Sequence, residues 1–178
     1  MIFGITGTPG TGKTSACKLL KKCIPYPVIP LNELIKKHQL YIGKDEERDS
    51  LIVDIDTLKL QISSILDVNK NIVIESHLSH YVSDIAIVLR TSPKELKKRL
   101  SLKRYSDAKI KENIEAEALD IILVEALELC NKVYEINTTN MTVEEVCNAI
   151  KEIIWNVHSP YLDEKYKYGL IDWSEEVF

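Results

Sequence analysis

The sequence has few of the features that mark a secreted or nucleic-acid-coating protein. Its four cysteines include no C-x-x-C pair, and its net charge is −4 with an isoelectric point near 5.6. Three of the four fall in helical patterns, so we expect small buried thiols, with a disulfide or a zinc site as the alternative. The acidic balance argues against a general nucleic-acid-coating role. The cysteines are Cys17, Cys23, Cys130 and Cys147.

Long hydrophobic runs are also missing. No segment approaches the roughly 18 consecutive apolar residues that a membrane-spanning helix needs. The first residues already read as a strand, which leaves no room for a secretion signal, so we expect a cytoplasmic protein without membrane contact. The 178 residues, 45% hydrophobic and 28% charged, are typical of a single soluble domain with its own core, spanning 1–178.

Glycine is scarce, and its distribution is uneven. Four of the six glycines lie within the first twelve residues. Residues 7–14 read G-x-x-x-x-G-K-T between an apolar run at 1–5 and a helical pattern at 15–20. A strand, a glycine-rich loop and a helix in this order are the setting of a phosphate-binding P-loop. The alternative is a glycine-rich turn that matches by chance.

Each residue type in this loop suits a nucleoside triphosphate. Gly10 and Gly12 let the backbone turn tightly and point its N–H groups at anionic oxygens. The following helix adds the partial positive charge of its N-terminus. Lys13 would span the β- and γ-phosphates, and the Thr14 hydroxyl would hold Mg²⁺. We therefore expect ATP and Mg²⁺ as cofactors.

Apolar runs alternate with helical patterns along the chain, which is typical of a parallel α/β sheet. Helices are expected from about residue 54, after Pro93, from 106 to 130 as one long helix, and after Thr142. The prediction is an α/β, three-layer P-loop nucleoside-monophosphate-kinase fold with a five-stranded parallel sheet. The expected strands are 2–6, 27–29, 71–75, 84–90 and 132–136.

Two insertions and two missing motifs narrow the class of P-loop protein. Residues 30–53, with Gly43 at a turn, and the basic connector at 102–110 lie where a nucleotide kinase has its acceptor (NMP) region, about 30–53, and its lid, about 102–113. A switch GTPase needs D-x-x-G and N-K-x-D, and neither is present. The L-S-G-G-Q signature of ABC-type ATPases is also absent. Small P-loop kinases and ATPases remain.

Four blocks in this order make the prediction more specific. They comprise residues 4–15, then 39–41 with 45–50 and 53–54, then 88–91 with 99–100, and finally 104–106 with 112–117. Together they resemble the atypical adenylate kinases of the isoenzyme-six type, the family of the coilin-interacting nuclear ATPase, including its archaeal members. The resemblance covers nearly the whole chain.

The resemblance implies reversible phosphoryl transfer from ATP to a nucleoside monophosphate, chiefly AMP, with a slower ATPase activity. It further implies a role in late maturation of the small ribosomal subunit, with transient binding of the universal small-subunit ribosomal protein eleven and of pre-small-subunit particles, as a monomer or weak homodimer. Two alternatives stay open: an assembly ATPase with a negligible kinase role, and a small-metabolite P-loop kinase.

The resemblance also suggests the donor-side residues. Ser15 would contact ATP, and Arg104 in the lid would stack on adenine or reach phosphate. Glu75 ends an apolar strand, where an acidic group near the metal is expected, and Glu75-Ser76-His77 stands where the family has Asp-x-His. A catalytic role for His77 competes with a structural one, as it does for His80. Arg104 could also belong to a solvated helix face.

The acceptor nucleotide would bind within residues 30–53. Related proteins often have Arg where this chain has Lys36, and residues 44–49 could equally be a charged surface turn. The expected acceptor residues are Asn32, Lys36, Arg48 and Asp49.

The C-terminal tail at 159–178 is rich in aromatic residues. Five of the chain's twelve aromatic residues lie at 161–178. Such residues need a surface to cover, either the protein's own core or a partner.

Overall fold

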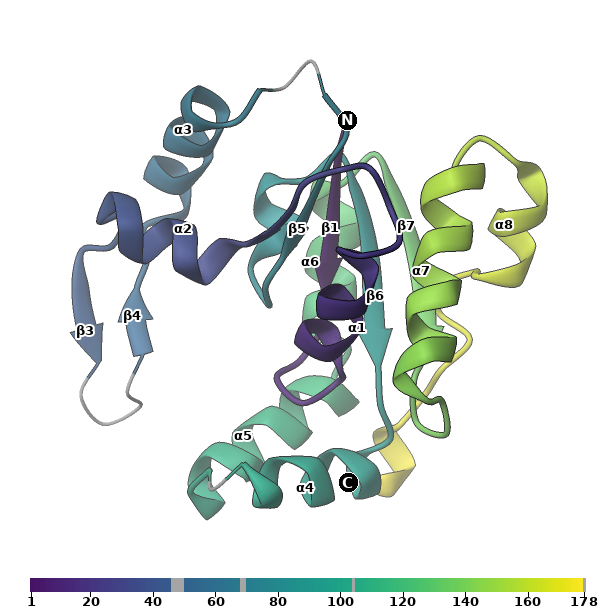
Figure 1. Ribbon diagram of the computed structural model, residues 1–178. Helices are drawn as coiled ribbons and strands as arrows, with labels where there is room; N and C mark the ends of the chain where they lie inside the picture. The colour runs from purple at the N-terminus through teal and green to yellow at the C-terminus, as the bar shows by residue number, and fades with distance from the viewer. Residues whose placement is uncertain (46–49, 68–69, 104, 178) are drawn as a thin grey trace.

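The computed structural model describes residues 1–45, 50–67, 70–103 and 105–177, and it has an α/β architecture (Figure 1). Helices and strands alternate along most of the chain. The elements are β1 (Ile2–Thr6), α1 (Lys13–Leu20), β2 (Val28–Pro30), α2 (Leu31–His38), β3 (Gly43–Asp45), β4 (Ser50–Ile52), α3 (Ile55–Ile65), β5 (Ile72–Glu75), η1 (Ser79–Val82), β6 (Ile85–Arg90), α4 (Pro93–Leu102), α5 (Asp107–Ala118), α6 (Ile121–Leu129), β7 (Lys132–Asn137), α7 (Val143–Asn156), α8 (Pro160–Lys165) and η2 (Ser174–Glu176).

The main sheet has five strands in the order β2-β5-β1-β6-β7, and every neighbouring pair is parallel. The predicted five-stranded parallel sheet is therefore confirmed. Ile5 of the central strand pairs with Glu75 on one side and Ile87 on the other. The carboxyl ends of β1 and β5 thus meet at one edge, where ligands bind in open parallel sheets.

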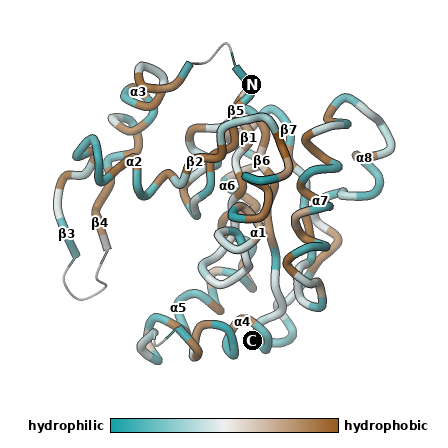
Figure 2. Tube along the Cα trace, in the orientation of Figure 1, coloured by the Kyte–Doolittle hydropathy of each residue, from teal (hydrophilic) through white to brown (hydrophobic). Residues whose placement is uncertain are grey.

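Both faces of the sheet are covered, as the apolar strand sequences require. Along β6, Ile85, Ile87 and Leu89 belong to the core shared with α1 and α7, whereas Ala86 and Val88 pack with α6. Figure 1 shows α1 and α7 in front of the sheet and α6 behind it. In Figure 2 the central strands are the most hydrophobic part of the trace. The fold is three-layered, as predicted.

Helix starts follow the capping residues in the sequence. The Asp54 carboxylate accepts from the backbone N–H of Thr57, and the Ser106 hydroxyl accepts from the N–H of Lys109. Thr142 forms a full capping box with Glu145. These contacts begin α3, α5 and α7 where the sequence predicts helices.

The prediction of one long helix from 106 to 130 is wrong. The structure has two helices, α5 and α6, separated at Leu119 and Asp120, and Asp120 has a left-handed backbone with φ 55°. The Arg90 guanidinium binds both the Glu117 carbonyl and the Asp120 carboxylate at this break. A buried cation therefore takes over the carbonyl at the end of α5 and stabilises the bend.

Residues 31–45 and 50–53 form a lobe beside the main sheet. It consists of α2 and an antiparallel β3–β4 hairpin, and α3 follows it. Gly43 lies in β3 paired with Ile52, so its predicted place at a turn is wrong. Leu31 and Ile35 of α2 pack with Leu58 and other apolar residues of α3, which fixes the inner face of α2.

The described part of the C-terminal tail packs on its own chain. Leu162 and Tyr166 are buried in the core under α7. The Tyr166 hydroxyl donates to Glu152 at 2.7 Å, and the Glu135 backbone N–H donates to the Tyr166 carbonyl at 3.0 Å. Of the two alternatives for the aromatic tail, the structure supports docking onto the protein's own core for Tyr166, whereas Tyr161 and Tyr168 are exposed.

The four cysteines are free thiols, so the disulfide alternative is excluded here. Cys17 and Cys147 are buried, and burial raises the pKa of Cys130 to about 11. Within the described ranges, no cluster of three or more His, Cys, Asp or Glu side chains could hold a metal ion, which leaves no zinc site there. No helix among those residues is long and apolar enough to cross a membrane.

We expect Thr142→Ala to lower the free energy of unfolding by about 1 kcal/mol, because it removes the hydroxyl that accepts from Glu145. Urea unfolding followed by circular dichroism measures the change. Thr142→Ser is the matched control, since it keeps the hydroxyl. An equal loss in both variants would contradict the capping explanation.

Candidate phosphoryl-transfer site

The loop between β1 and α1 requires glycine at several positions. Gly7, Gly10 and Gly12 have φ values of 128°, 102° and 101°. A Cβ on Gly7 would lie 2.3 Å from the Leu89 carbonyl oxygen, and one on Gly10 would lie 2.7 Å from Leu96. The loop is thus packed tightly against β6 and α4 and leads directly into the N-terminus of α1. This is the backbone geometry that a phosphate cradle needs.

Lys13 lies folded back over this loop. Its side chain is buried, and Nζ donates to the carbonyls of Gly7 at 2.6 Å and Thr8 at 3.0 Å. Burial lowers the pKa of Lys13 to about 8, while the negative charges of Glu75 and Glu117 act in the opposite direction. The buried ammonium therefore has carbonyl dipoles as its direct partners, and an anion in the cavity would compensate its charge more fully.

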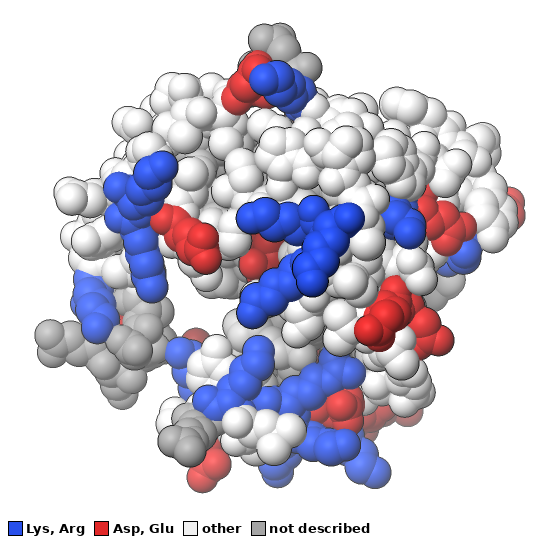
Figure 3. Space-filling model, viewed as in Figure 1, with Lys and Arg blue, Asp and Glu red and all other residues white. Residues whose placement is uncertain are grey.

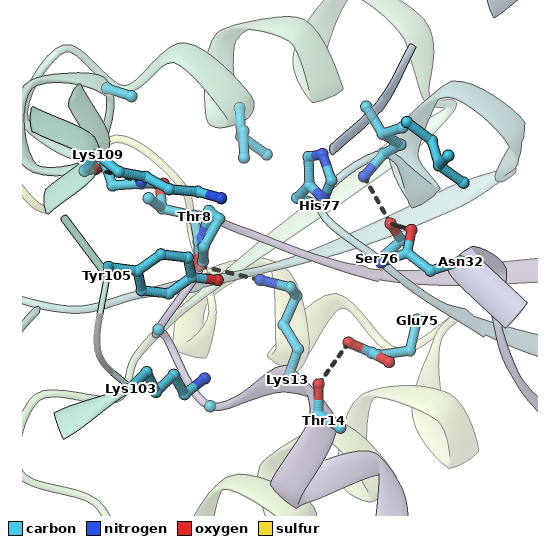
Figure 4. A pocket seen from close by; sticks show the side chains of 18 of the residues that line it. Thr8, Lys13, Thr14, Asn32, Glu75, Ser76, His77, Lys103, Tyr105 and Lys109 are labelled. Carbon is cyan, nitrogen blue, oxygen red and sulfur yellow. Dashed lines mark hydrogen bonds between the residues drawn. The ribbon is translucent and has the colours of Figure 1, made fainter. Parts of the chain in front are cut away.

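Thr14 and Glu75 form a pair of oxygen groups beside the loop. The Thr14 hydroxyl donates to a Glu75 carboxylate oxygen at 3.0 Å (Figure 4). Thr14 lies in the first turn of α1 and Glu75 ends β5 beside β1, so the parallel register brings them together. Mg²⁺ in such sites takes one or two protein oxygens, with phosphate and water completing its shell. The donor set here fits Mg²⁺, which would neutralise charge on phosphate oxygens when bound.

His77 and Ser76 follow Glu75 on the cavity wall. Partial removal from water, followed by the positive charges of Lys13, His80 and Lys109, lowers the pKa of His77 to about 4. The imidazole is therefore neutral at pH 7 and can accept a hydrogen bond. The Ser76 hydroxyl contacts the Asn32 side-chain oxygen at 3.2 Å, which connects β5 to α2.

His80 is placed differently. It is 1% exposed, with Nδ1 3.1 Å from the Thr6 hydroxyl and Nε2 3.0 Å from Glu125 on α6. It does not line the main cavity. Of the two histidines that the sequence suggested, His77 faces the cavity and His80 connects β1 to α6.

A cavity of about 600 Å³ unites these groups. The space-filling view is hollowed between the α2–β3–β4 lobe and the body of the molecule, and Lys and Arg side chains border this hollow (Figure 3). The sequence-predicted residues that line the cavity come from the phosphate loop, α1, α2 and the end of β5. They are Gly10, Gly12, Lys13, Thr14, Ser15, Asn32, Lys36, Glu75 and His77.

Three predicted residues cannot be placed. Arg48, Asp49 and Arg104 lie outside the residues that the structure describes. The connector that contains Arg104 does border the cavity, because Lys103 and Tyr105 line it.

The structure adds individual residues within the predicted lid region of about 102–113, which the sequence had suggested only as a region. Lys109 and Asn113 line the cavity from α5, and Lys109 Nζ lies 4.7 Å from the centre of the Tyr105 ring (Figure 4). Lys109, Asn113 and Ala116 are spaced by four and three residues, which places them on one face of the helix. This spacing is present in the sequence, but a charged helix face alone predicts exposure to solvent. Only the cavity opposite the helix shows that this face lines a site.

Known proteins resemble this chain over most of its length. Residues 4–120 match the family described as "AAA domain". A protein of Methanosarcina barkeri named "Putative adenylate kinase" is 50% identical over 181 residues, covering 99% of this chain and 100% of the relative. A protein of the same name from Methanocaldococcus jannaschii is 40% identical over 179 residues, covering 100% and 96%. The chain belongs to this AAA-domain family. Both named relatives match it over at least 96% of their own length.

Solved structures confirm the fold of this family member. A shikimate kinase from Bacteroides thetaiotaomicron superposes with a TM-score of 0.57 at 15% identity, covering 87% of this chain and 98% of the other. Shikimate kinase from Acinetobacter baumannii in complex with shikimate gives a TM-score of 0.62 at 12% identity, covering 89% and 94%. At these identities the likeness establishes a P-loop kinase fold.

Proposed function

We propose that this protein is an adenylate kinase, which transfers the γ-phosphoryl group of ATP to AMP and yields two ADP. The observation that carries the proposal is the shared cavity. The phosphate loop with Lys13 lies at one side, and Asn32 and Lys36 of α2 line the same space. Glu75 and His77 lie on its wall as well. The relatives named "Putative adenylate kinase" support the same assignment.

On the donor side, the residues would act by alignment and charge neutralisation. The amides of the loop and the Lys13 ammonium would hold the β- and γ-phosphates, with Ser15 near the α-phosphate. Thr14 and Glu75 would hold Mg²⁺. Residues of the connector and α5, with Arg104 among them, would form a lid over ATP, within a region of about 102–113.

On the acceptor side, residues 30–53 would bind the nucleoside monophosphate. Asn32 and Lys36 are positioned for its polar groups, with Arg48 and Asp49 as further candidates. A neutral His77 would donate its ring N–H to an oxygen of the attacking phosphate, or accept from a neighbouring water, as the oxygen–phosphorus bond forms and the bond to ADP breaks.

The test is a coupled assay with ATP, Mg²⁺ and AMP. Formation of two ADP for each AMP consumed supports the proposal. Hydrolysis of ATP with AMP untouched would favour the assembly-ATPase reading, and ADP release with shikimate or another small alcohol in place of AMP would favour a metabolite kinase.

We also propose the finer properties that the family resemblance implies. These are slow ATP hydrolysis and a role in small-subunit rRNA maturation with the universal small-subunit ribosomal protein eleven. Their support is the resemblance of the four sequence blocks. Co-purification of that ribosomal protein with the full chain at low salt, and a change in turnover on its addition, test them.

We expect ATP binding to take up about half a proton at pH 8, because the free Lys13 has a pKa of about 8 and a bound polyphosphate raises it. The lowered pKa of the free state means that Lys13 is half neutral at this pH and fully charged in the complex. Calorimetric titrations in two buffers of different ionisation enthalpy measure the uptake. At pH 6.5 it should vanish, since Lys13 is charged in both states.

The control for this proton uptake is Lys18→Ala, which removes an exposed lysine of the same helix. An equal uptake in Lys13→Met would assign the proton to another group and contradict the explanation.

A further inference from the structure

A group of buried charges lies behind the phosphate loop, outside the cavity. Arg90 at the end of β6 is 2% exposed, and its guanidinium binds three carboxylates. Glu117 of α5 accepts from Nε at 2.8 Å and Glu135 of β7 accepts from Nη1 at 2.7 Å, while Asp120 binds Nη2. Burial raises the pKa of Glu135. Apolar residues of similar size could replace a buried ion-pair cluster without loss of stability. Stability alone therefore does not explain why these charges are buried here.

One side of this group reaches the phosphate loop. The second carboxylate oxygen of Glu117 accepts from the Thr8 hydroxyl at 2.5 Å, and both side chains are 2% exposed. The carbonyl of Thr8 in turn accepts from Lys13 Nζ and from the Thr11 hydroxyl, each at 3.0 Å. Glu117 thereby holds the loop residue whose carbonyl binds the Lys13 ammonium.

The other side of the group reaches the C-terminal segment 166–173, which we name the C-terminal strap. The second oxygen of Glu135 accepts from the Gly169 N–H at 2.9 Å. The backbone N–H of Glu135 also donates to the Tyr166 carbonyl at 3.0 Å, which places the strap against β7. In Figure 1 the strap descends from α8 beside β7 toward α4.

A continuous chain of hydrogen bonds therefore runs from the loop to the strap. It passes through Thr8, Glu117, Arg90, Glu135 and Gly169. Each of the four links is a buried or partly buried bond, and the two central links are ion pairs. The loss of one therefore leaves an uncompensated group rather than a water-filled gap.

We propose that Glu117 is a positioning residue that couples the C-terminal strap to the phosphate loop, with Arg90 and Glu135 as the connecting links. The proposal rests on nucleoside triphosphate binding at this loop. ATP would draw Lys13 from the Thr8 carbonyl toward its phosphates. The conformation of Thr8 that permits this change is set by the Thr8–Glu117 bond. If docking of the strap on β7 strengthens ATP binding by some factor, then ATP binding must favour the docked strap by the same factor, because linkage is reciprocal.

The first experiment measures ATP affinity with Mg²⁺ by calorimetry on full-length variants. Thr8→Val and Glu117→Gln should each weaken ATP binding about 3- to 10-fold, and the double variant should be no weaker than the worse single one. Thr8→Ser keeps the hydroxyl and should bind as the wild type does. Glu115→Gln, a partly exposed glutamate two residues away on the same helix, is the matched control.

The second experiment follows the strap itself. Amide hydrogen exchange of peptides that cover 166–173 should slow about 3-fold or more when ATP and Mg²⁺ are added to the wild type, and should change little in Thr8→Val at saturating ATP. A role of Glu117 in stability alone would lower the melting temperature of the variants without altering this response.

The outcomes separate the two proposals. Wild-type protein that binds no ATP would overturn both the proposed function and the coupling. ATP binding of equal strength in the wild type, Thr8→Val and Thr8→Ser, with the same exchange response in the strap, would overturn the coupling alone. If Glu117→Gln does not fold, the two Thr8 variants decide the question, because valine removes the hydroxyl that donates to Glu117 and serine keeps it.

Discussion

Lys13→Ala is expected to reduce kcat/KM for ATP by about 10³-fold or more and to leave the protein folded. The ammonium is the charged group that would lie against the β- and γ-phosphates, and alanine removes it entirely. Among the described residues, its hydrogen-bond partners are the carbonyls of Gly7 and Thr8, which water can satisfy in the variant. Steady-state rates with ATP and AMP, together with a thermal melt, measure both parts of the prediction.

Lys18→Ala provides the control for this prediction, since Lys18 is an exposed lysine in the last turn of the same helix. Its rates should match those of the wild type. Residual Lys13→Ala activity within tenfold of the wild type would mean that the loop binds phosphate without its lysine, and the assignment of the donor site would have to be withdrawn.

Glu75→Gln is expected to lower kcat by about 10²-fold and to raise the Mg²⁺ concentration needed for half-maximal ATP binding. The amide keeps the size of the side chain and can still accept from Thr14, but it loses the negative charge that attracts a divalent cation. Titration of ATP binding against Mg²⁺, followed by fluorescence of a labelled nucleotide, reports the affinity change without depending on turnover.

Two further variants make the Glu75 experiment specific. Glu75→Asp should retain most of the activity, because the family resemblance places an aspartate at this position. Glu33→Gln removes an exposed glutamate of α2 and should change nothing. An unchanged Mg²⁺ dependence in Glu75→Gln would show that the carboxylate has a structural role beside Thr14.

Much of the fold could be predicted because the determining signals are local. The glycine-rich loop, the Val- and Ile-rich strands and the capping residues Ser106 and Thr142 each act within a few positions of the chain. Lys13 and Thr14 line the cavity, and the roles proposed for them follow from their positions in the loop. The parallel order of the strands then brings Glu75 to Thr14, a contact across 61 residues.

What the sequence did not show depends on partners that are distant along the chain. The break at Asp120 arises from Arg90, 30 residues away, and the Thr8–Glu117 bond joins residues 109 apart. A helical pattern alone predicts continuity through 106–130, because the local sequence contains no proline or glycine there. Lys109 was missed for a related reason, since the lid-side face of α5 is defined only by the cavity opposite it.

The two edge strands of the sheet, β2 and β7, are protected from pairing with another chain in different ways. β2 is preceded by Pro27 and ends in Pro30, and both prolines lack the N–H that an intruding strand would bind. On the opposite side, the segment after α8 occupies the N–H of Glu135. A proteolytic cut before Tyr166 would uncover this rim, and we therefore expect clipped preparations to self-associate through β7 where intact ones stay dispersed.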